Sequence, residues 1–200
     1  MAPENPRPRL DRAMTRAAHG LYASAHNDID TVLAADSEAP LAYLILAHLY
    51  ANQQQYAEAL GALDSYVESA GYGPGVYAAR AGIHSDPGHY EKALDDFNRA
   101  LDTYEYSALT HAQKGLTYSR MDQHSRADSS FSRARALDST NAYVHYLRAC
   151  AAVLRGADSS AVALLDRALQ AGFRDAELVG TVPALQPLHD TPGYLAVETR

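Results

Sequence analysis

The chain has 200 residues, of which 47% are hydrophobic and 20% charged, and its net charge is −7. No stretch reaches the roughly 18 consecutive apolar residues of a membrane-spanning helix, so we expect no membrane partner. The single cysteine, Cys150, excludes an internal disulfide framework, and the first residues, MAPENPRPRL, lack the apolar core of a secretory signal. These features favour a cytoplasmic protein.

A stripe of small and large apolar residues recurs along the chain. Its steps of three, four and three residues keep the side chains on one face of an α-helix, which turns by about 100° per residue. Five copies follow one another at a constant interval of 34 residues. In chain order they are Tyr22, Ala25, Ile29 and Val32; Tyr56, Ala59, Leu63 and Tyr66; Tyr90, Ala93, Phe97 and Ala100; His124, Ala127, Phe131 and Ala134; and Ala161, Leu165 and Ala168.

A second helical segment precedes the stripe in each of the later copies, at 42–50, 76–84, 111–119 and 144–152. Turn-forming residues separate the two segments at Gly20, Gly88, Asp122 and Gly156. Each unit is therefore predicted to be a helix A, a short turn and a helix B.

These units resemble tetratricopeptide repeats, which have a 34-residue period and a similar small and aromatic signature. The resemblance is carried by residues such as Ala47 and Ala59 in the second unit, Ala93 and Phe97 in the third, and Gly115 in the fourth. It implies an all-α fold, a right-handed superhelical solenoid of antiparallel helix pairs. We expect one domain over residues 1–200, with repeats at 6–39, 40–73, 74–107, 108–141 and 142–175 and a proline-broken C-terminal cap at 176–200.

The sequence departs from the family pattern at two places. His111 and His145 stand where helix A usually opens with a large aromatic residue, and we expect their polar edges to face solvent. Helix A of the first unit carries Arg9, Arg12 and Arg16 in place of apolar residues, which is consistent with a polar terminal repeat that keeps the end of a solenoid soluble.

A second stripe on each helix A lines the concave groove in proteins of this family. Carried over to this chain, the partner-binding groove comprises Leu41, Leu44, His48, Asn52, Ala78, Gly82, Asp86, Leu109, Ala112, Leu116, Arg120, Tyr143, Tyr146 and Cys150. Some relatives clamp a carboxylate with polar residues at these places, but Leu44, His48 and Ala78 occupy them here.

The apolar groove has three interpretations. It holds an apolar peptide or amphipathic helix of a partner protein, it forms a homodimer, or the curvature of the solenoid buries part of it. The first is the preferred hypothesis and predicts a protein-interaction adaptor or chaperone-like scaffold.

Catalysis is not expected. The sequence has no H-E-x-x-H, no glycine-rich phosphate loop and no G-x-S-x-G, so we predict no catalytic residues, no metal ligands and no cofactor. A pairing of Cys150 with a histidine stays open, although a lone cysteine is more often a buried apolar residue.

Charge is distributed unevenly. Residues 25–107 hold 13 acidic and 3 basic residues, whereas residues 108–175 hold 9 basic and 6 acidic residues. The asymmetry either steers a bipolar partner or reflects solvated helix faces. No dense Lys/Arg run or reader motif is present, so no nucleic-acid partner is expected.

Overall fold

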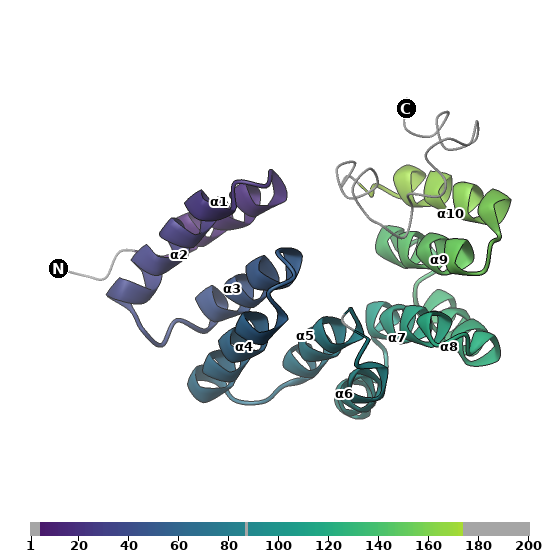
Figure 1. Ribbon diagram of the computed structural model, residues 1–200, viewed down its shortest axis with the longest axis horizontal. Helices are drawn as coiled ribbons and strands as arrows, with labels where there is room; N and C mark the ends of the chain where they lie inside the picture. The colour runs from purple at the N-terminus through teal and green to yellow at the C-terminus, as the bar shows by residue number, and fades with distance from the viewer. Residues whose placement is uncertain (1–4, 87, 174–200) are drawn as a thin grey trace. The chain divides into compact units, whose positions relative to one another are not determined.

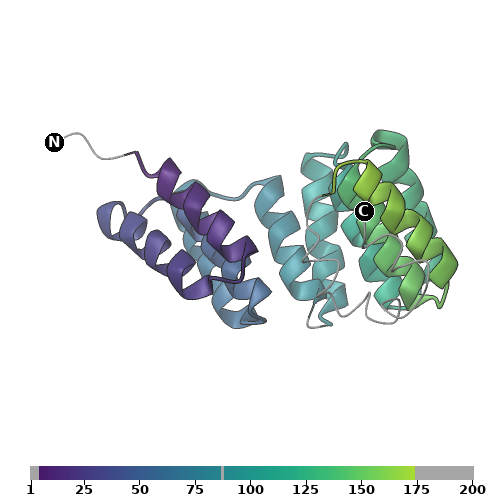
Figure 2. The ribbon, with the colours of Figure 1, turned by 90° about the horizontal axis from the view of Figure 1, so that it is seen from above.

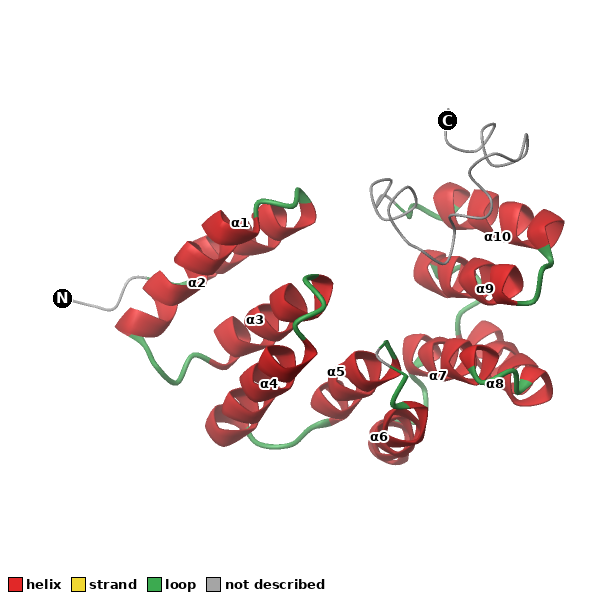
Figure 3. Cartoon of the chain, in the orientation of Figure 1, coloured by secondary structure: helices red, strands yellow, loops and turns green. Residues whose placement is uncertain are grey.

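The computed structural model describes residues 5–86 and 88–173, and the regular elements in these ranges are all α-helices (Figures 1 and 3). They are α1 (Arg7–Ala18), α2 (Tyr22–Ala35), α3 (Pro40–Asn52), α4 (Tyr56–Ala70), α5 (Pro74–Ser85), α6 (Tyr90–Thr103), α7 (Ala108–Arg120), α8 (His124–Leu137), α9 (Ala142–Leu154) and α10 (Asp158–Gln170). The all-α prediction is confirmed. The predicted cap at 176–200 lies outside the described residues.

The helices begin at the places that the repeat period predicts. Tyr22, Tyr56, Tyr90, His124 and Asp158 each open a helix B, and each lies 34 residues after the one before. Helix A begins at the same interval in the second to fifth units, at positions 40, 74, 108 and 142. The predicted helix–turn–helix pattern is therefore confirmed.

The turn between helix A and helix B has the same backbone conformation in all five units. Gly20, Gly88 and Gly156 have φ of 68°, 86° and 68°, and the equivalent Gln54 and Asp122 have φ of 60° and 56°. Glycine adopts this left-handed conformation without a steric cost, aspartate tolerates it, and glutamine does so less readily. The sequence predicted four of these turn residues but not Gln54, because glutamine gives no turn signal.

Contacts divide the chain into two compact units, Met1–His89 and Tyr90–Arg200. The boundary falls inside the third predicted repeat, between α5 and α6. In the first unit α1 packs on α2 and α3 on α4; in the second, α7 packs on α8 and α9 on α10, and the α9–α10 pair can be followed in Figures 1 and 2. A single domain over the whole chain stays a prediction.

Small residues let the paired helices approach each other closely. Every helix B has a fully buried alanine at the same place of the repeat, in the set Ala25, Ala59, Ala93, Ala127 and Ala161. The partner helix also has a small residue in the fourth repeat: Gly115 of α7 faces Phe131 of α8, and a Cβ added to it would lie 3.1 Å from the Phe131 ring. Because these positions have no room for larger side chains, they fix how near the helices stand.

The arginines of α1 form an ion cluster with α2. Arg12 donates to both carboxylate oxygens of Asp28, from Nε at 2.9 Å and Nη2 at 2.5 Å, and Arg16 Nη1 donates to Asp28 Oδ2 at 2.6 Å. Asp28 is buried, whereas both arginines keep part of their side chains in solvent. Arg12 and Arg16, two of the three arginines expected to keep the end of the solenoid soluble, therefore also bind α1 to α2.

Candidate functional site

In the compact unit Met1–His89, the predicted groove residues of α3 lie on one face of the helix at steps of three and four. Leu41 is 42% exposed, and His48 and Asn52 are also exposed. The ring of His48 contacts the Leu44 carbonyl, with Nδ1 and the oxygen 2.9 Å apart. Leu44 is only partly accessible, because it packs against the core cluster that contains Ala47. The accessible apolar surface of α3 therefore depends mainly on Leu41.

On α5 the predicted groove residues are two small residues and an acid, and the first of them, Ala78, is partly buried. A Cβ built on Gly82 would meet nothing within 4 Å in its unit, so this position leaves open surface. Asp86 is exposed and directly follows the helix. Gly82 and Asp86 therefore add little apolar surface to a groove.

In the second unit, α7 presents one large exposed apolar side chain. Leu109 is 39% exposed, whereas Leu116 is partly buried against the core and Arg120 is partly accessible. Ala112, between them on the same stripe, is fully buried. Since α7 packs beside α9, these residues are continued by the stripe of α9.

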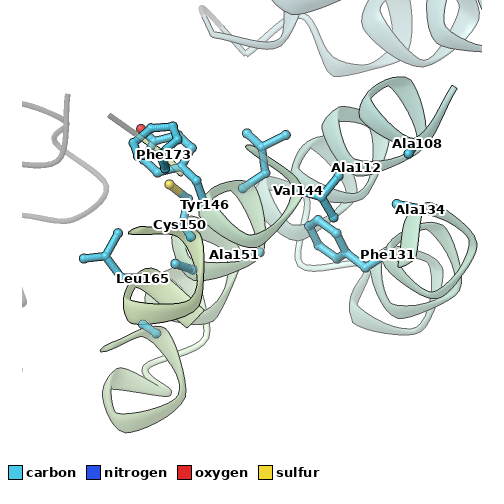
Figure 4. Close-up of a cluster of buried hydrophobic side chains, with 14 of the residues drawn as sticks. Ala108, Ala112, Phe131, Ala134, Val144, Tyr146, Cys150, Ala151, Leu165 and Phe173 are labelled. Atoms are coloured by element: carbon cyan, nitrogen blue, oxygen red, sulfur yellow. The ribbon is translucent and has the colours of Figure 1, made fainter. Parts of the chain in front are cut away.

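Part of the predicted groove on α9 is covered by the chain itself. Tyr146 is buried and stacks on Phe173, with ring centroids 4.7 Å apart and planes inclined by 13°. The ring of Tyr143, still 39% exposed, lies 5.8 Å from that of Phe173. Figure 4 shows Tyr146, Cys150 and Phe173 gathered on one side of α9. Tyr143 is therefore the accessible apolar residue at this place, and Phe173 is a residue that the sequence stripe did not identify.

The thiol of Cys150 is unsuited to nucleophilic chemistry. Burial raises the pKa of this thiol to about 11, so it is protonated at neutral pH and lacks the reactive thiolate form. Among the described residues, no group of three or more His, Cys, Asp or Glu side chains is placed to hold a metal ion. In the same ranges no helix has the length and apolar character needed to cross a bilayer.

His111 and His145 hold the loops that precede their helices. Nε2 of His111 donates to the Glu105 carbonyl at 3.1 Å, and Nε2 of His145 to the Ser139 carbonyl at 3.1 Å. Tyr43, at the equivalent place of the second repeat, donates its hydroxyl to the carbonyl of the residue six positions before it, at 2.9 Å. The expectation that the polar edges of the histidines face solvent is thus corrected, because one nitrogen of each ring bonds a backbone carbonyl.

A separate pocket lies in the second unit between α8, α9 and α10. Its volume is about 330 Å³, and its basic residues are Arg135, Arg148 and Arg155. Arg148 and Tyr146 are two residues apart on α9, which places the pocket and the predicted groove on opposite faces of this helix. Sequence reasoning noted the basic character of residues 108–175 but not this convergence, because it needs three helices to be brought together.

Comparisons with known proteins agree with the repeat period. The family model of the tetratricopeptide repeat matches residues 10–74. TTC0263, a thermophilic tetratricopeptide repeat protein of Thermus thermophilus, is similar in structure with a TM-score of 0.72 and 22% identity, over 91% of this chain and 100% of its own. PilW, a widely conserved type IV pilus biogenesis factor, gives a TM-score of 0.66 at 16% identity, over 96% of this chain and 97% of its own.

A third similar structure is YrrB, a tetratricopeptide repeat protein with an unusual peptide-binding site, with a TM-score of 0.52 and 18% identity over 84% of this chain and 87% of its own. No curated protein matches the sequence significantly. Residues 10–74, which span most of the first two predicted repeats, match the tetratricopeptide repeat family model, and the solved structures show the same fold over most of the chain.

Proposed function

We propose that the protein is a non-catalytic adaptor that holds an apolar peptide or helix of a partner protein on its A helices. One observation carries this proposal. Leu41, Leu109 and Tyr143 occupy the same place in three repeats, near the start of helix A, and are 42%, 39% and 39% exposed. In the second unit α7 packs beside α9, so Leu109 and Tyr143 place exposed apolar side chains on neighbouring helices, as at many contact surfaces. Leu41 offers the same kind of residue in the first unit, and Gly75 stands at this place in the third repeat.

The similar structures support a peptide as the ligand without identifying it. YrrB is described by its peptide-binding site, and helical repeats in general bind partners along the surface that successive A helices form. In the row of this chain the residues are leucine and tyrosine, so the chemistry fits apolar anchors spaced along a helix or an extended segment.

The test is partner capture from the native source, followed by measurement of the dissociation constant of the captured segment by calorimetry. The double variant Leu41→Glu/Leu109→Glu should weaken binding at least tenfold, because it places charges in an apolar contact. Leu21→Glu is the matched control: Leu21 is 55% exposed but precedes α2, outside the row. Equal dissociation constants for the double variant and the control would contradict the proposal.

The competing occupant is a second copy of the chain. Under the proposal, light scattering shows a monomer of 21.6 kDa at micromolar concentration. A dimer that Leu109→Glu dissociates, and Leu21→Glu does not, would assign the row to self-association instead.

A further inference from the structure

The pocket between α8, α9 and α10 is lined by basic, hydroxyl and apolar residues. Arg135 and Ser132 come from α8, and Ser160 from the first turn of α10. Phe131 and Leu164 are among its apolar lining residues. Its volume of about 330 Å³ lies at the lower end of the range for small-molecule sites.

Most of the positive charge in this pocket is not neutralised by the protein. Asp128 is the carboxylate among the lining residues, and it pairs with Arg155 at 2.7 Å. Within residues 5–86 and 88–173, Arg135 and Arg148 take part in no hydrogen bond or ion pair. The Nε of Arg155 is buried and also has no hydrogen-bond partner in these ranges.

The environment of Arg148 is unfavourable for a guanidinium. It is partly buried, and burial lowers its pKa, as do the charges of Arg135 and Arg167, while the charge of Asp128 opposes them with a smaller effect. A cation that loses water beside other cations destabilises the folded state unless an anion compensates it. A partly buried cation with a lowered pKa that lines a pocket marks a candidate binding site.

We propose that this pocket binds the phosphate group of a small molecule, held by Arg135 and Arg148. Guanidinium groups match phosphate oxygens with paired donors, and the hydroxyls of Ser132 and Ser160 add donors of the kind found in phosphate sites. The N-cap of α10 is Ala157, which provides no side-chain cap, and the first turn also carries the carboxylate of Asp158, so the anion site depends on the two arginines. The apolar lining residues then contact the remainder of the ligand.

This inference is independent of the adaptor proposal, because the two surfaces lie on opposite faces of α9. The test is an NMR titration of the full chain with inorganic phosphate at constant ionic strength. Saturable shifts are expected for the backbone amide of Ser160 and the side chain of Arg148. Arg148→Gln and Arg135→Gln should each raise the dissociation constant at least fivefold.

Arg126→Gln removes the same charge from an exposed residue of α8 that does not line the pocket, and should leave the dissociation constant unchanged. Arg135 is itself exposed, so its variant keeps the test valid if Arg148→Gln fails to fold. Linear shifts, or equal dissociation constants for Arg135→Gln and Arg126→Gln, would overturn the site.

Two further probes define the ligand class. Acetate should bind more weakly than inorganic phosphate, and equal binding would overturn the assignment to phosphate. Phenyl phosphate should bind more tightly than inorganic phosphate, because its ring can contact Phe131 and Leu164. Weaker binding of phenyl phosphate would overturn the assignment to a larger phosphorylated molecule.

Discussion

Asp28 on α2 is buried against α1 and accepts two hydrogen bonds from Arg12, with Arg16 as a third donor. In the second repeat Leu46 and Ala62 occupy the places of Arg12 and Asp28, so the same two helices meet there through apolar residues. The first helix pair is therefore joined by charge as well as by the packing of Leu10, Ala13 and Ile29.

Asp28→Asn should lower the free energy of unfolding of the first unit by about 1–3 kcal/mol, because it leaves two arginines without their carboxylate. Asp30→Asn, on the exposed face of the same helix, is the matched control and should have little effect. Urea unfolding followed by circular dichroism measures both. Equal midpoints for the two variants would show that the cluster contributes nothing to stability.

The same cluster predicts an acid dependence. The hydrogen bond from Arg12 is the main reason why the pKa of Asp28 is lowered. A lowered folded-state pKa adds stability that is complete above the ordinary carboxyl pKa, near 4, and is lost as pH falls through the folded value. The difference in unfolding free energy between the parent and Asp28→Asn should therefore shrink below about pH 4.

His111 and His145, which hold their loops, predict a second loss of stability on acidification, at a pH closer to neutral. Burial is the main cause that lowers the pKa of His111 and of His145. As pH falls below about 6.5, the unfolded chain binds protons before the folded chain does, so stability decreases. His111→Tyr/His145→Tyr should keep the loop hydrogen bonds, as Tyr43 does, and remove this decrease. Melting temperatures from pH 7.5 to 5 measure it, and parallel curves for parent and variant would refute it.

The turn between helix A and helix B has one residue in the left-handed backbone conformation in each repeat, and its residue type can be swapped between repeats as a test. Gln54→Gly should stabilise the protein by about 0.5–1 kcal/mol, since Gln54 has φ of 60° and glycine adopts this conformation freely. The reciprocal Gly156→Gln, at φ of 68°, should destabilise it by a similar amount. Thermal unfolding of both variants gives the answer, and changes of the same sign would contradict the argument.

Gly115 and Phe131 should be energetically coupled. Gly115→Ala improves helix propensity but places a methyl group 3.1 Å from the Phe131 ring. Phe131→Leu removes the ring, so the methyl group added by Gly115→Ala should cost less in that background. The next repeat already has this combination, with Ala149 and Leu165 at the two equivalent places. A double-mutant cycle should give a coupling of about 0.5–2 kcal/mol, and strict additivity would contradict the close contact.

Much of the fold could be predicted because the period is written in residue types with a clear packing role. Alanines such as Ala59 and Ala127 mark where helices touch, and the 34-residue interval then places each helix start. Phe173 could not be predicted as a partner of Tyr146, because it follows the last complete helix pair and belongs to no stripe. Arg12 was interpreted only as a polar residue of the terminal repeat, since its pairing with Asp28 depends on how α1 and α2 lie in space.

The central claim, an apolar binding row on the A helices, is tested most directly by site-specific photo-crosslinking in the native source. Benzoylphenylalanine placed at position 109, and separately at position 143, should form an adduct with the same partner protein. The same residue at the exposed position 133 of α8 should form none. Adducts that form only at position 133, or that join two copies of this chain at positions 109 and 143, would contradict it.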